Sequence, residues 1–279
     1  TCNAISYCNA EPILIDVDKK TLGLCPIALE SWLDDNAALD QQGFCIFKKS
    51  KQPIKACIPM HTFGHPVEID SIISICKKWN INVIEDAAES LGSFYKNIHT
   101  GTFGIMGTLS FNGNKIITTG GGGAILCNQE TYAKGKHLST TAKVPSETHF
   151  YHDQVGFNYR MPNLNAALGC AQLESLNFYL EKKRNLAMEY QEFFEGTEYY
   201  FFKEPKNCHS NYWLNTIFCQ DKDHRDNFLA ILNNQKIMAR PIWTPMNKLP
   251  MFSSALSDGL TNTTWLEDRV VNIPSSVIL

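Results

Sequence analysis

The chain has 279 residues, a net charge of −3 and a hydrophobic content of 44%. These values are typical of a globular protein with one large domain, or a large and a small one, and they argue against disorder and fibrous repeats. The charge balance offers no basic surface for nucleic acid or an anionic membrane. No run of 18 or more apolar residues is present either. We therefore expect neither a nucleic-acid partner nor a membrane partner.

Short β-rich runs alternate with helical patterns over the first 130 residues. Strands are predicted at 12–17, 56–60, 82–85, 108–111 and 123–127, and helices at 27–39 and 69–79. This alternation predicts an open α/β sheet, in which ligands bind beyond the carboxyl ends of the strands. A long helical region is predicted at 163–194, followed by a smaller region with a strand at 213–218 and a helix at 226–233.

Ten cysteines are spread singly along the chain, without a C-x-x-C pair or a His/Cys cluster at zinc spacing. Most of them lie within apolar runs, as Cys57 and Cys127 do. Free thiols persist in reducing compartments, whereas disulfides form in oxidising ones. The sequence therefore predicts buried free cysteines, no metal site and a cytoplasmic location.

Acidic residues gather at the end of the predicted strand 82–85, where Glu85, Asp86 and Glu89 lie around a pair of alanines. The carboxyl end of a strand is where α/β proteins place cofactors. The alternative is that Asp86 caps a helix beginning at the alanines.

Lys115 lies in a polar loop just past the predicted strand 108–111, and it is the only basic residue between Lys96 and Lys134. A lysine shielded from water can attack a carbonyl group, because burial favours the neutral amine. The alternative is an ordinary solvated loop lysine.

Two further motifs carry weaker signals. The glycine run at 120–123 lacks the Gly-Lys-Ser/Thr ending of a P-loop, so we expect a turn into the next strand. His61 and His65 match no metal motif. A structural role and a substrate-lining role for His61 both fit the sequence.

Taken in order, these motifs resemble the DegT/DnrJ/EryC1/StrS aminotransferases. The matching segments are 61–66, 85–92, 101–104, 110–115, 118–124, 156–163 and 166–173. The similarity runs through the chain and is strongest over 56–190. It implies an α/β protein of the pyridoxal-phosphate (PLP) dependent transferase fold type I, similar to aspartate aminotransferase. That fold would place a large PLP-binding domain with a mostly parallel sheet at 1–175 and a smaller C-terminal α/β domain at 176–279.

The resemblance assigns two catalytic roles. Lys115 corresponds to the lysine that binds PLP covalently and later moves a proton. Asp86 corresponds to the acid that faces the pyridine nitrogen and keeps it protonated. Glu89 matches a position near the 3-oxygen of PLP, where an ionised glutamate would need a proton or a partner.

The remaining site residues are also implied by the resemblance. Ser110 corresponds to a hydroxyl that binds the cofactor phosphate, and Asn158 to a residue that the neighbouring subunit donates to the same phosphate. The resemblance therefore implies a homodimer with shared active sites. Arg160 is expected to pair with the nucleotide diphosphate, and Tyr159 and His61 are the other expected substrate contacts.

The implied reaction moves an amino group from glutamate to a nucleotide-linked 4-keto-6-deoxy sugar, for amino-sugar and surface-polysaccharide biosynthesis. A GDP-perosamine-type enzyme and transfer at C3 of the sugar are the alternatives. Sugar 3-dehydratases of the same fold carry histidine in place of the cofactor-binding lysine, so Lys115 argues against that class.

Family members begin with further elements, including a Ser-Gly-Thr phosphate loop and an aromatic residue that stacks on the cofactor ring. This chain starts at Thr1, just after that aromatic position, and its C-terminal segment is short as well. We expect a piece of a longer enzyme, and a truncated non-catalytic paralogue is the alternative.

Overall fold

The structure, a computed structural model, describes residues 1–277. The last two residues of the predicted C-terminal domain lie outside the described residues. The helices are α1 (Cys2–Tyr7), α2 (Pro26–Asn36), α3 (Ile69–Lys78), α4 (Gln129–Ser139), α5 (Asn163–Glu174), α6 (Leu176–Phe193), α7 (Lys222–Asn234) and α8 (Thr261–Glu267). Among these residues, no helix combines the length and apolar character needed to cross a bilayer.

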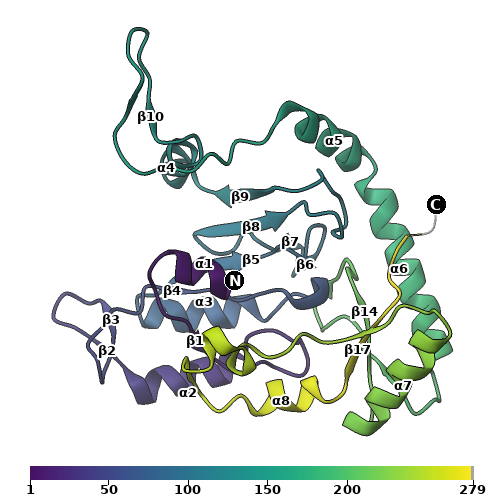
Figure 1. Cartoon of the computed structure of the whole chain (residues 1–279). Coiled ribbons are helices and arrows are strands. Elements are labelled where there is room, and N and C mark those ends of the chain that lie inside the picture. The colour runs from purple at the N-terminus through teal and green to yellow at the C-terminus, as the bar shows by residue number, and fades with distance from the viewer. Residues whose placement is uncertain (278–279) are drawn as a thin grey trace.

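A four-stranded sheet forms the centre of the N-terminal half (Figure 1). Its order is β4-β5-β8-β9, formed by β4 (Ala56–Cys57), β5 (Asn82–Asp86), β8 (Met106–Ser110) and β9 (Gly123–Cys127). β4, β5 and β8 run parallel, and β9 runs antiparallel to β8. Because β5 and β8 are parallel neighbours, their last residues, Asp86 and Ser110, lie on the same side of the sheet, where the parallel strands have their carboxyl ends.

Helix α3 packs on this sheet because its apolar residues repeat at helical spacing. Ile69, Ile72, Ile75 and Cys76 are buried in one core together with Val83 of β5. Two lysines in the last turn of α3 also suit the negative end of the helix dipole. The helix thereby fixes β5, the strand that carries the acidic residues of the site.

The C-terminal half contains a second four-stranded sheet, which is antiparallel. Its order is β12-β14-β17-β15, formed by β12 (Tyr200–Phe201), β14 (Asn215–Phe218), β17 (Val270–Ile273) and β15 (Arg240–Pro241). Ile217 of β14 and Val271 of β17 share a buried core with Ala187 of α6.

Shorter strands complete the molecule, and some link distant parts of the chain. They are β1 (Ile13–Leu14), β2 (Ala37–Leu39), β3 (Cys45–Phe47), β6 (Phe94–Tyr95), β7 (Ile98–His99), β10 (Lys143–Val144), β11 (Tyr151–His152), β13 (Cys208–His209) and β16 (Leu256–Ser257). β16 pairs with β1, so residues beyond 250 return to the N-terminal half. The domain division at residue 175 stays a prediction.

The α/β class is confirmed, and three details are corrected. The predicted helix 163–194 is two helices that meet at Ser175, and the predicted strands 12–17 and 56–60 keep only two residues each. All ten cysteines are free, but only Cys25, Cys45, Cys76 and Cys219 are buried, while Cys8, Cys170 and the expected core residue Cys127 are exposed. Its strand β9 is the edge of the sheet and alternates exposed and half-buried residues.

Candidate active site

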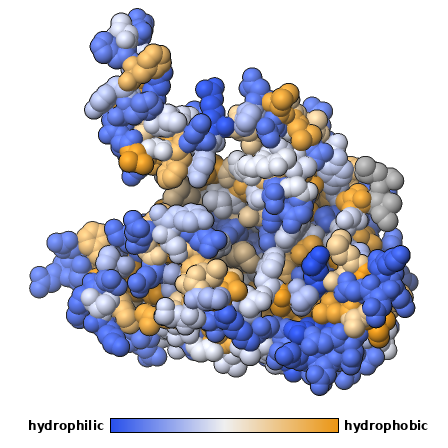
Figure 2. Space-filling model, viewed as in Figure 1, coloured by the Kyte–Doolittle hydropathy of each residue, from blue (hydrophilic) through white to orange (hydrophobic). Residues whose placement is uncertain are grey.

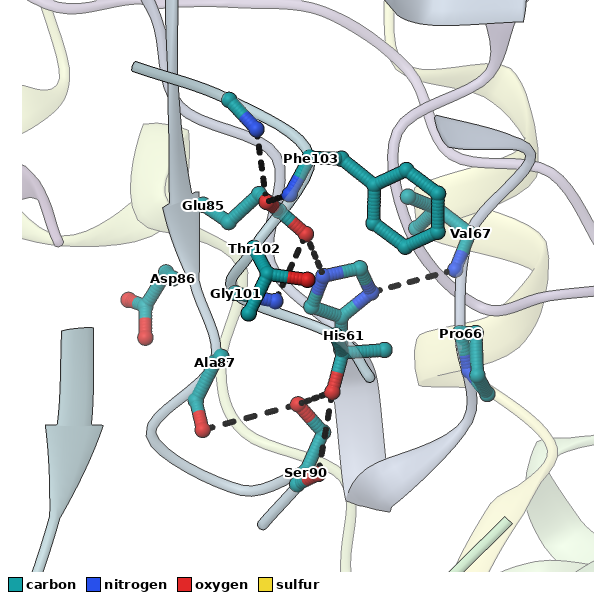
Figure 3. A network of polar contacts seen from close by, with 12 residues as sticks. His61, Pro66, Val67, Glu85, Asp86, Ala87, Ser90, Gly101, Thr102 and Phe103 are labelled. Carbon is teal, nitrogen blue, oxygen red and sulfur yellow. Dashed lines mark hydrogen bonds and ion pairs between the residues drawn. The ribbon is translucent and has the colours of Figure 1, made fainter. Parts of the chain in front are cut away.

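The end of β5 sends its two acidic side chains to different surroundings, because successive residues of a strand point to opposite faces. Glu85 is fully buried and accepts hydrogen bonds from His61 Nε2 at 3.1 Å and from the backbone N–H groups of Gly101, Phe103 and Gly104 at 2.6–2.8 Å. Figure 3 shows that the Asp86 carboxyl group stays outside this network. Burial alone would raise the pKa of Glu85, but the bonds from His61 and the backbone outweigh it and lower the pKa. Glu85 therefore ties the 101–104 turn to the sheet as a carboxylate.

His61 lies within this network and has no exposed surface. Its Nε2 atom faces Glu85, and its Nδ1 atom accepts a hydrogen bond from the backbone N–H of Val67 at 3.3 Å. Both ring nitrogens thus have partners inside the chain. This geometry favours the structural role of His61 over the expected substrate contact.

Asp86 is half-buried at the carboxyl end of β5. Its carboxylate accepts hydrogen bonds from the hydroxyl of Thr1 and from the backbone N–H of Ala88, the latter at 3.2 Å. No helix follows Asp86, since residues 87–92 form turns. The helix-cap alternative is therefore wrong. Asp86 lies at the carboxyl end of β5, where α/β sheets bind cofactors.

Lys115 lies in the loop between β8 and β9, and it is shielded rather than solvated. Its side chain is 13% exposed, and its Nζ atom lies 3.5 Å from Glu89 Oε1 and 3.8 Å from the centre of the Trp213 ring. A small hollow beside the amine is lined by Ala88, Glu89, Leu91, Ser110, Lys115 and Ile116. The partly desolvated lysine that the sequence suggested is confirmed.

Glu89 has the partner that its position requires. Besides Lys115, the backbone N–H of Phe63 donates a 2.8 Å hydrogen bond to its carboxylate. Burial raises the pKa of Glu89 to about 7, although the nearby ammonium of Lys115 and the bond from Phe63 act in the opposite direction. Glu89 can therefore gain or lose a proton near neutral pH, next to the lysine amine.

Three sequence-predicted residues lie elsewhere, on an arm that projects from the body. The arm consists of α4, the β10–β11 hairpin and the segment up to residue 160, and it stands away from the rest of the chain (Figures 1 and 2). Asn158 and Arg160 line a groove of about 870 Å³ together with Lys136 and Lys143. Tyr159 is 76% exposed. Within one chain, none of the three lines the hollow beside Lys115.

One contact in the site is not predicted by the sequence: the Lys115 amine lies over the indole ring of Trp213. Trp213 comes from the C-terminal half, just before β14, and it is 5% exposed. The sequence predicted it only as the first residue of a strand. Nothing in its local pattern points to a lysine so far away in the chain.

The fold and the site define a class of protein: an α/β protein with the fold of the type I transferases, in which a shielded lysine lies beside Glu89 and Ser110. The solved structure of a DegT/DnrJ/EryC1/StrS aminotransferase from Brucella abortus superposes with a TM-score of 0.89 at 24% identity, covering 100% of this chain and 72% of that one. PseC of Helicobacter pylori, an aminotransferase of pseudoaminic acid biosynthesis, superposes with a TM-score of 0.86 at 21% identity, covering 98% and 71%. At these identities the likeness establishes the fold.

The model of the DegT/DnrJ/EryC1/StrS aminotransferase family matches residues 1–279, and the chain belongs to this family. EpsN of Bacillus subtilis, named as a pyridoxal phosphate-dependent aminotransferase, is 37% identical over 260 residues, which is 92% of this chain and 63% of EpsN. The GDP-perosamine synthase of Escherichia coli O157:H7 is 34% identical over 257 residues, 90% of this chain and 64% of that enzyme. The chain thus spans somewhat less than two thirds of the length of these relatives.

Proposed function

We propose that this chain is part of a PLP-dependent aminotransferase that moves an amino group from glutamate to a nucleotide-linked 4-keto-6-deoxy sugar. The observation that carries the proposal is the shielded amine of Lys115. It lies beside a hollow near the carboxyl ends of β5 and β8. Family membership and the name of EpsN support PLP-dependent amino transfer, and the name of the GDP-perosamine synthases supports a nucleotide-linked sugar.

The chemistry of the side chains around the hollow fits PLP. Of the residues that line it, Lys115 supplies an amine for the aldehyde and Ser110 a hydroxyl for the phosphate; Asp86, at the end of β5, supplies a carboxylate for the ring nitrogen. Glu89, with a pKa near 7, can donate a hydrogen bond to the 3-oxygen when protonated. When bound, PLP supplies an electron sink that stabilises negative charge on the substrate carbon.

The chain's own residues then have definite tasks. Lys115 would hold the cofactor covalently through Nζ and, as a free amine, would move a proton at the substrate carbon. Asp86 keeps the proton on the ring nitrogen, because a carboxylate stabilises positive charge there. Trp213 and Leu91 limit the access of water to the amine.

A homodimer would complete this site. Asn158 and Arg160 lie in the groove of the arm, apart from the hollow of their own chain. The arm also exposes several large apolar side chains, Phe150 (88%), Tyr151 (61%), Val155 (89%) and Phe157 (51%), and Leu164, just beyond it in α5, is 86% exposed. Exposed apolar side chains of this kind suit a surface that another protein covers. We propose that a second copy covers it and receives Asn158 at its cofactor phosphate and Arg160 at the substrate diphosphate.

The names of the relatives narrow the choice of nucleotide and sugar in the substrate. Two relatives at 34% and 30% identity are named GDP-perosamine synthases. These names favour a second candidate, a GDP-linked 4-keto sugar aminated at C4.

The free cysteines suit a reducing compartment, and we propose that the enzyme works in the cytoplasm.

Covalent trapping tests the proposal. The chain is incubated with PLP and reduced with borohydride, and the modified peptide is identified by mass spectrometry. We expect a phosphopyridoxyl group on Lys115, and none on the Lys115→Ala variant, whereas Lys134→Ala, a change at an exposed lysine, behaves like wild type. Specific modification at another lysine would overturn the role of Lys115.

A further inference from the structure

Trp213 contacts the reactive amine across a long stretch of sequence. The Lys115 Nζ atom lies 3.8 Å from the centre of its ring, while Glu89 Oε1 lies 3.5 Å from the same nitrogen. Trp213 and Glu89 are 5% and 7% exposed. Cation–π attraction is strongest where both groups are shielded from water, and an indole ring attracts a cation better than the rings of tyrosine or phenylalanine.

The indole is fixed in place by hydrogen bonds at its edge and along its backbone. Its Nε1–H group donates to the Asn114 carbonyl at 2.7 Å, one residue before the lysine. Its backbone N–H donates to Asn211 Oδ1 at 2.8 Å, and its carbonyl accepts a 3.0 Å bond from the buried Lys183 of α6. The ring therefore stays aligned with the loop that carries Lys115.

Asn211 also links the two groups that contact the amine. Its Nδ2 atom donates to the carbonyls of Glu89 at 2.8 Å and Leu91 at 2.9 Å, while its Oδ1 atom holds the backbone of Trp213. Asn211 has no exposed surface. One buried side chain thus links the backbone of Glu89 to the backbone of Trp213, the two residues whose side chains contact the lysine amine.

A lysine that is repeatedly bonded to a cofactor and released from it benefits from neighbouring groups that restrict its side chain. Its long side chain has many rotamers when free, and restricting them brings the amine back to the same place. A carboxylate attracts the ammonium strongly through its charge and so stabilises the unreactive protonated form. A ring face attracts the same cation more weakly, so it guides the amine at a smaller cost to its reactivity.

We propose that Trp213 is a positioning residue for Lys115: its indole face, fixed by Asn114, Asn211 and Lys183, holds the amine at the hollow whenever the lysine is not bonded to the cofactor. The inference uses the proposed function only in the role that this function gives Lys115. The contact itself belongs to the cofactor-free chain.

The first arm of the test therefore uses no cofactor. Lysines are reductively methylated with ¹³C-formaldehyde, and the Lys115 signal is assigned by its loss in Lys115→Arg. A methyl group over an indole ring experiences an upfield ring-current shift, so we expect an upfield Lys115 signal that returns to the ordinary lysine position in Trp213→Leu. An unshifted signal in the wild-type chain would overturn the proposal.

The second arm measures how fast PLP becomes attached to Lys115. Trp213→Phe and Trp213→Leu both lose the Nε1–H group, but only phenylalanine keeps a ring face. We expect attachment to be about fivefold slower in the leucine variant than in the phenylalanine variant. Trp79→Leu is the matched control, because Trp79 has Lys78 5.8 Å from the centre of its ring, packs against a different core, and should leave the rate unchanged.

A fluorinated-tryptophan chain covers the case in which Trp213→Leu fails to fold. Fluorine weakens the attraction of the ring for a cation while keeping its shape, so labelling should slow attachment in the wild-type background and leave the rate unchanged in the Trp213→Phe background. Equal rates for the phenylalanine and leucine variants, or no effect of fluorination, would contradict the positioning role. A wild-type chain that never attaches PLP would refute the proposed function, whereas the cofactor-free signal still decides the contact.

Discussion

Two side chains hold the amine of Lys115, and they do so by different physical means. Glu89 attracts it through charge at 3.5 Å, and Trp213 attracts it through a ring face at 3.8 Å. Because Glu89 is buried, its pKa rises to about 7, so the charge beside the lysine changes near neutral pH. The strength with which the amine is held thus depends on pH.

The Glu89→Gln variant tests this titration through stability. Glutamate in the unfolded chain titrates near 4.5, whereas Glu89 in the folded chain titrates at about 7. Between these values the folded state holds a proton that the unfolded state has lost, so raising the pH destabilises the fold. We expect the unfolding free energy of wild type, relative to Glu89→Gln, to fall by about 1.4 kcal/mol per pH unit across this window. Urea unfolding measures it, and parallel pH profiles of the two chains would contradict the shift.

At the scale of elements, β5 combines a structural acid and a site acid on adjacent residues. Glu85 secures the turn at 101–104, and that turn leads into β8 and the lysine loop. Asp86 lies outside that network, half-buried at the end of the strand. The position of Asp86 and Ser110 at one edge therefore depends on the buried carboxylate behind them.

The Glu85→Gln variant should lose stability through this network. Glutamine keeps one acceptor oxygen but replaces the other with an NH2 group, so two of the four donors face another donor, and we expect a loss of roughly 3 kcal/mol at neutral pH. Because the folded pKa of Glu85 is lowered, its contribution exists above about 4.5 and is lost as the pH falls below that value. Chemical denaturation measures both effects. Glu68→Gln, a change at an exposed residue next to α3, is the control and should change little; equal stability of Glu85→Gln and this control would contradict the account.

Local sequence patterns were enough to predict several of these elements. The apolar spacing of α3, the β-rich runs of β5, β8 and β9, and the polar loop around Lys115 all report on their own surroundings. The break between α5 and α6 at Ser175 was missed, because the apolar residues on both sides continue at helical spacing. Element boundaries depend on packing that a local window does not contain.

At the scale of the whole molecule, residues far apart in sequence meet in ways that no local pattern encodes. Trp213 lies under Lys115 because α6 and the second sheet return to the lysine loop. The exposed β9 edge and the apolar arm were likewise unpredicted, since their burial depends on what covers them outside one chain. The resemblance, rather than composition or periodicity, supplied Asn158 and Arg160.

Subunit mixing tests whether the arm serves a neighbouring site. Lys115→Ala and Asn158→Ala chains are each expected to be inactive alone. If Asn158 acts in the other subunit, a mixed dimer has one site with both residues intact, and random mixing restores about a quarter of the wild-type sites. If Asn158 acts in its own chain, no intact site forms. Activity that stays absent after mixing would therefore contradict the shared site.

The most direct test of the central claim, that Lys115 binds PLP and that the bound cofactor accepts an amino group from glutamate, is an absorbance spectrum with PLP before and after glutamate. We predict a visible band from the lysine-bound cofactor that bleaches when glutamate is added, and that is missing from Lys115→Ala. A wild-type chain without this band, a band that Lys115→Ala retains, or a band that glutamate leaves unchanged would contradict the claim.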